Sequence, residues 1–72
     1  MNRQRITFSR RIGGFVVSFN GCLTGMILSP ETDGGNVWRW ISQWGEISEH
    51  TSLFEAQDYA THCVLIDHHF PA

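Results

Sequence analysis

Alternating apolar and polar residues mark three candidate strands in the first part of the chain. Residues 5–12 alternate regularly, which predicts a half-buried strand. Residues 15–19 and 22–29 are further runs rich in β-branched and aromatic residues. The pairs Gly13-Gly14 and Asn20-Gly21 that separate these runs are typical of two-residue hairpin turns. We therefore expect three consecutive antiparallel strands.

The two predicted turns also predict the register of the strands. With these pairs as loops, Phe19 faces Cys22, Phe15 faces Met26, and Ile12 faces Phe15. The opposite face of the predicted sheet carries both polar and apolar side chains and is basic at one edge. The predicted core face carries Ile6, Phe8, Ile12, Phe15, Val17, Phe19, Cys22, Met26 and Leu28.

A tryptophan-rich segment, residues 37–44, predicts the fourth strand. Trp38, Trp40 and Trp44 share one parity, so one face of this strand is nearly all indole. A stripe of this kind is typical of the core strand of a small sheet. Residues 46–48 either extend this strand past a bulge at Gly45 or form a short fifth one.

A helix is expected to close the chain, from Leu53 to about Ile66. Ser52 and Glu55 have capping-box spacing. Small residues on one side would let the helix lie close to a sheet of bulky side chains. We predict a single α+β domain over residues 1–72, a four-stranded antiparallel meander sheet with one C-terminal helix packed on one face. The small residues of the helix are Ala56, Ala60 and Cys63.

Charge divides the chain into a basic and an acidic part. Residues 1–30 hold four arginines and no acid, while residues 31–72 hold Arg39 and all seven acids, and there is no lysine. The formal net charge is −2. Such asymmetry is consistent with an interaction surface.

Catalytic and metal-binding patterns are weak. His62 and Cys63 are adjacent and would point about 100° apart on a helix. The histidines and cysteines form no pair with zinc-ligand spacing. We expect no metal, no cofactor and no enzymatic activity. With two distant cysteines and no long apolar run, we also expect reduced thiols, no membrane span and a cytoplasmic location.

Three binding functions are compatible with the sequence. The first is binding to a host protein or ribonucleoprotein complex. The second is nucleic-acid binding by the open sheet face through Arg5, Arg11 and Arg39. The third is a homodimeric structural or regulatory module. The candidate partner-binding residues for the first are Glu46, Glu49, Glu55, Asp58, Arg39, Trp38, Trp40 and Trp44.

The layout resembles small proteins of phages and mobile elements of the anti-CRISPR type. The resemblance lies in the strand-turn-strand segment 14–21, the tryptophan-rich strand, and residues 52–56 at the start of the helix. It implies inhibition of a host complex by binding, in the host cytoplasm, and it assigns no functional residue.

Overall fold

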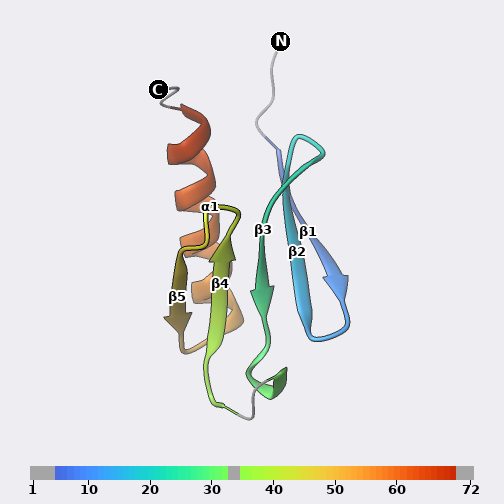
Figure 1. Cartoon of the computed structure of the whole chain (residues 1–72), viewed down its shortest axis with the longest axis vertical. Helices are drawn as coiled ribbons and strands as arrows, with labels where there is room; N and C mark the ends of the chain where they lie inside the picture. Colours follow the sequence, from blue (N-terminus) through green and yellow to red (C-terminus); the bar gives the residue numbers. More distant parts are fainter. Residues whose placement is uncertain (1–4, 33–34, 70–72) are drawn as a thin grey trace.

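Five antiparallel strands and one helix form the protein in the computed structural model (Figure 1), which describes residues 5–32 and 35–69, with side chains up to Ile66. The sheet order is β1-β2-β3-β4-β5, so the expected meander is confirmed, with five strands in place of the expected four. The elements are β1 (Ile6–Arg11), β2 (Gly14–Phe19), β3 (Cys22–Leu28), the 3-10 helix η1 (Pro30–Thr32), β4 (Trp38–Ser42), β5 (Ile47–His50) and α1 (Leu53–His69).

The fifth strand exists because a tight turn ends β4 at Ser42. The backbone N–H of Ser42 donates to the carbonyl of Glu46 (2.9 Å), and that of Gly45 donates to the carbonyl of Ser42 (3.0 Å). The Ser42 hydroxyl oxygen also accepts from the N–H groups of Trp44 (3.2 Å) and Glu46 (3.1 Å). The tryptophan-rich strand is therefore shorter than predicted, and Ile47–His50 folds back beside it.

The β1–β2 turn lies one residue earlier than the sequence predicts. Arg11 pairs with Gly14, so Ile12 and Gly13 form the loop. Ile12, predicted to lie in the core, is fully exposed. The reason is steric: a Cβ at Gly14 would collide with the carbonyl of Ile27, so this glycine is needed within the strand. Gly13, with φ +84°, takes the left-handed position of the turn.

The second predicted turn, Asn20-Gly21, is confirmed. Phe19 pairs with Cys22, and both loop residues have positive φ, 51° and 88°. After this turn, β3 has one more residue than the pairing with β2 requires, and this residue, Thr24, forms a β-bulge. The Thr24 hydroxyl donates to the carbonyl of Val17 (3.0 Å).

This bulge reverses the predicted orientation of the rest of β3. Ile27 is fully buried on the helix side and pairs with Phe15, which was expected to face Met26. Met26 and Leu28 lie on the opposite face, and Met26 is 40% exposed. Their predicted place in the core was wrong because one extra residue exchanges the two faces of a strand.

The core lies between the sheet and α1, which packs on β3, β4 and β5 (Figure 1). The Ser52 hydroxyl accepts from the Glu55 N–H (3.1 Å), which confirms Ser52 as the N-cap, while the Glu55 carboxylate accepts from the N–H of Thr51 in place of the reciprocal capping-box bond. The helix continues past Ile66 to His69. In the described residues, no helix has the length and apolar character needed to cross a bilayer. The buried apolar residues are Val17, Phe19, Ile27, Trp40, Ala56, Ala60 and Val64.

Ala60→Leu should destabilise the protein by about 1–3 kcal/mol, because Ala60 is fully buried against the sheet and a larger side chain would overpack this contact. Urea denaturation followed by tryptophan fluorescence measures the change. His62→Leu is the matched control, since His62 is exposed on the same helix. Equal stability of Ala60→Leu and wild type would contradict the packing of this helix face on the sheet.

The sheet face opposite α1, here called the open face, includes two rows of residues that cross all five strands. The apolar row contains one residue from each of the strands β2 to β5. Its position on β1 is occupied by Ser9. The charged row has arginine at the β1 edge and glutamate at the β5 edge. The apolar row is Val16, Met26, Ile41 and Ile47, and the charged row is Arg11, Gly14, Leu28, Arg39 and Glu49.

Candidate partner-binding edge

Three of the four predicted acids lie at the edge formed by β5 and α1. Glu46 is in the turn before β5, and Glu55 and Asp58 are in the first part of α1. All three are exposed. Glu49 is on β5 but belongs to the open face, because it pairs with Arg39 in the charged row.

An open hollow of about 380 Å³ lies along this edge. Tyr59 and Ile66, seven residues apart on α1, supply apolar surface and are 45% and 48% exposed. The hollow therefore combines carboxylates with partly exposed apolar side chains, and none of the described residues that line it is a lysine or an arginine. Its lining residues are His50, Glu55, Asp58, Tyr59, His62, Cys63 and Ile66. We call this hollow, together with Glu46, the acidic edge.

The β5 wall of the hollow is held by side-chain contacts. Ser48 and His50 are two positions apart on β5, so their side chains lie on the same face of the sheet, the one that faces α1. The Ser48 hydroxyl and His50 Nε2 are 2.8 Å apart and share a hydrogen bond. The rings of His50 and Tyr59 are 4.8 Å apart at an angle of 46°. These contacts fix one side of the hollow before any partner arrives.

Hydrogen bonds favour the ionised form of Glu55. The Thr51 hydroxyl (2.8 Å) and the Thr51 N–H (3.2 Å) both donate to Glu55 Oε1, and together with nearby His50 they lower the pKa of this carboxyl. At Tyr59 the effect is opposite: the Cys63 thiol, and after it burial and the Glu46 carboxylate, raise the pKa of the phenol. The hollow therefore presents a carboxylate and a neutral phenol at neutral pH.

The other predicted partner-binding residues lie elsewhere. Trp40 is 2% exposed in the core, and Trp38 is half-buried against it. Trp44 lies in the turn after β4 and is 69% exposed, so it offers the largest indole surface to a partner. Arg39 is on the open face, where its guanidinium lies 3.1 Å from the carboxylate of Glu49. The predicted set is thus divided between the core, the open face and the acidic edge.

The predicted nucleic-acid residues lie on the opposite side of the sheet from α1. Arg11 and Arg39 share the charged row, and Arg5 immediately precedes β1. The Arg11 guanidinium donates to the carbonyl of Arg10 (2.9 Å). In the apolar and charged rows there is no aromatic side chain on which a base could stack.

The histidines and cysteines do not gather into a ligand set in the described residues, which contain no group of three His, Cys, Asp or Glu side chains that could hold a metal ion. Cys22 is exposed after the second hairpin turn, and Cys63 is partly buried beside the hollow. The side chains of His68 and His69 lie outside the described residues.

Sequence reasoning missed His50, Tyr59 and Ile66 as parts of the site. The available signal was the seven-residue spacing of two apolar residues on one side of the helix, next to the acids. Comparisons with protein families, curated proteins and solved structures found no significant match to this chain.

Proposed function

We propose that this protein is a binding module without catalytic activity, which inhibits a host complex by occupying a basic surface of one of its proteins. The observation that carries this proposal is the acidic edge. It joins exposed carboxylates to a preformed hollow with apolar walls, and the described lining residues include no lysine or arginine. A surface of this composition suits a partner with opposite charge and long aliphatic side chains.

The partner chemistry follows from the shape of the hollow. A lysine or arginine side chain could place its aliphatic stem against Ile66 and its charge near Glu55 and Asp58. The exposed ring of Tyr59 adds a cation–π surface. Host proteins that handle nucleic acid present such basic side chains where phosphate normally binds. Inhibition then means competing with nucleic acid for the same surface. The anti-CRISPR resemblance itself implies only inhibition by binding.

Nucleic-acid binding is the second candidate, and one observation favours it. Arg11 and Arg39 lie in the same row of the open face, where a phosphate backbone could cross both. The Glu49 carboxylate beside Arg39 works against this function, because it offsets one of the two charges. The two candidates therefore use opposite faces of the molecule.

The double variant Glu46→Lys with Asp58→Lys should weaken binding of a fluorescent deca-arginine peptide at least about tenfold, because it reverses two charges at the acidic edge. Fluorescence anisotropy at two salt concentrations measures the affinity, which should also fall as salt screens the charges. Glu31→Lys is the matched control, since Glu31 is exposed on η1 and does not line the hollow.

A labelled single-stranded RNA in the same assay separates the two candidates. Protein binding predicts that the wild type binds the peptide and leaves the RNA free. The reverse result, with RNA binding lost in Arg11→Glu and kept in the acidic-edge variant, would replace the proposal by nucleic-acid binding. A pull-down from host lysate with and without nuclease extends the same comparison to natural partners.

A further inference from the structure

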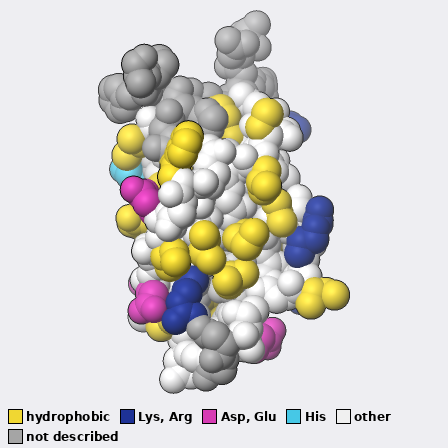
Figure 2. Space-filling model, in the orientation of Figure 1, with side chains coloured by type: hydrophobic (Ala, Val, Ile, Leu, Met, Phe, Trp, Pro, Cys, Tyr) yellow, Lys and Arg dark blue, Asp and Glu magenta, His cyan; other side chains and the backbone are white. Residues whose placement is uncertain are grey.

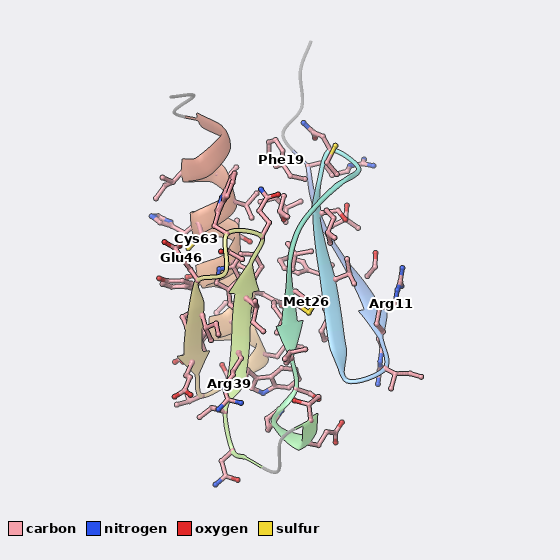
Figure 3. All side chains as sticks on the ribbon, in the orientation of Figure 1. Arg11, Phe19, Met26, Arg39, Glu46 and Cys63 are labelled. Carbon is pink, nitrogen blue, oxygen red and sulfur yellow. The ribbon has the colours of Figure 1, made fainter. Side chains whose placement is uncertain are left out.

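The open face carries charges that are complementary to the same face of another molecule. Its charged row begins with Arg11 at the β1 edge and ends with Glu49 at the β5 edge. Figure 2 shows apolar side chains gathered across the middle of this face with charged groups towards the sides, and Figure 3 places Arg11 and Met26 on it. The two edges are four strands apart, about 19 Å, so Arg11 and Glu49 cannot form an ion pair within one chain.

We propose that the open face binds a second copy of this chain around a two-fold axis that runs along β3. Such an axis exchanges the two edges, so β1 of one copy lies over β5 of the other. Met26 then faces Met26 of the second copy at the centre, and Val16 faces Ile41. At both edges, Arg11 of one copy faces Glu49 of the other, which produces two intermolecular ion pairs.

The usual geometry of stacked sheets accommodates these contacts. Two sheets pack about 10 Å apart, with strand directions that differ by about 30°. A rotation of this size moves the edge strands by about 5 Å relative to one another, which is within reach of arginine and glutamate side chains. Gly14 has no side chain, so it leaves space for Arg39 of the second copy at the position opposite.

The size of the face predicts a dimer of moderate affinity. Five strands about 4.8 Å apart and about 20 Å long give a face of about 500 Å² per copy, or about 1,000 Å² for the pair. This is the lower end of the range for specific interfaces. Exposed apolar surface is available to be buried, since Met26 and Ile47 are 40% and 62% exposed. We expect dissociation in the micromolar range.

The dimer and the acidic edge use different surfaces. The hollow lies between β5 and α1 on the helix side, so stacking two open faces leaves it uncovered in both copies. The dimer can therefore be tested without reference to the partner, and failure of one proposal does not decide the other.

Sedimentation velocity of the full chain, from about 1 µM to about 1 mM, tests the proposal. Wild type should pass from monomer to dimer, and Met26→Glu should raise the dissociation constant at least about a hundredfold, because two carboxylates would meet on the axis. Phe54→Glu is the control, since Phe54 is 77% exposed on α1, and it should leave the dimer unchanged. Circular dichroism verifies the fold of each variant.

A charge exchange tests the predicted pairing itself. Arg11→Glu and Glu49→Arg should each weaken the dimer, and the double variant should restore it, because each ion pair would then form with reversed signs. Amide chemical shifts that change on dilution of wild type should fall on Val16, Met26 and Ile41, which requires no variant. A monomer at the highest concentration, a dimer insensitive to Met26→Glu, no recovery in the double variant, or dilution shifts confined to α1 would each overturn the proposal.

Discussion

Gly25→Ala is expected to destabilise the protein by about 3 kcal/mol, the upper end of the usual penalty for overpacking a core. A Cβ on Gly25 would lie 2.5 Å from the carbonyl oxygen of Ile41 and 2.5 Å from Cη2 of Trp40. The backbone of β4 and a buried indole would both have to move. Urea denaturation, followed by circular dichroism, measures the loss.

The same substitution in a Trp40→Phe background separates the two causes. Phenylalanine lacks the outer atoms of the indole, so the clash with the ring should be relieved while that with the Ile41 carbonyl stays. The cost of Gly25→Ala should therefore be smaller in this background by about 1 kcal/mol. If the two substitutions are strictly additive, Gly25 does not serve as the space into which Trp40 packs.

Trp40→Ala should remove about 4 kcal/mol of stability, since Trp40 is 2% exposed at the centre of the sheet–helix contact. A chain of 72 residues has roughly 4–11 kcal/mol in total, so this loss would leave roughly 0–7 kcal/mol of stability. Thermal denaturation by circular dichroism measures this effect. We expect a lower melting temperature and a smaller transition.

Trp44→Ala is the matched control for this result. It removes the same side chain from a position that is 69% exposed in the β4–β5 turn, so its effect should stay within about 1 kcal/mol. Equal losses from both substitutions would mean that β4 does not present Trp40 to the core. The control variant also tests binding, because Trp44 offers indole surface to a partner.

Most of the fold could be predicted from short-range patterns. Asn20-Gly21 predicts its turn because both loop residues need positive φ, and Ser52 with Glu55 predicts the helix start through local hydrogen bonds. The errors arose where contacts between strands decide the outcome. The bulge at Thr24 and the inclusion of Gly14 in β2 both depend on the distance between neighbouring backbones. This distance cannot be predicted from the local sequence pattern.

The candidate site was only partly predictable for a related reason. The acids at positions 46, 55 and 58 could be proposed from charge distribution alone. The hollow between them needs His50 from β5 to meet Tyr59 from α1, which is a tertiary contact. The tryptophan stripe is compatible, in the sequence, with both a core strand and a binding surface. Trp40 lies in the core because Gly25 leaves space beneath it.

The order of the strands has a consequence for how the chain is made. Every strand pairs with the one before it, so during synthesis each hairpin can form as soon as its second strand leaves the ribosome. The helix that covers Val17, Ile27 and Trp40 follows all five strands in the sequence. Until it emerges, the nascent sheet presents its apolar side uncovered. The interval between completion of β5 and emergence of α1 is therefore when the growing chain is most exposed to aggregation and to capture by chaperones.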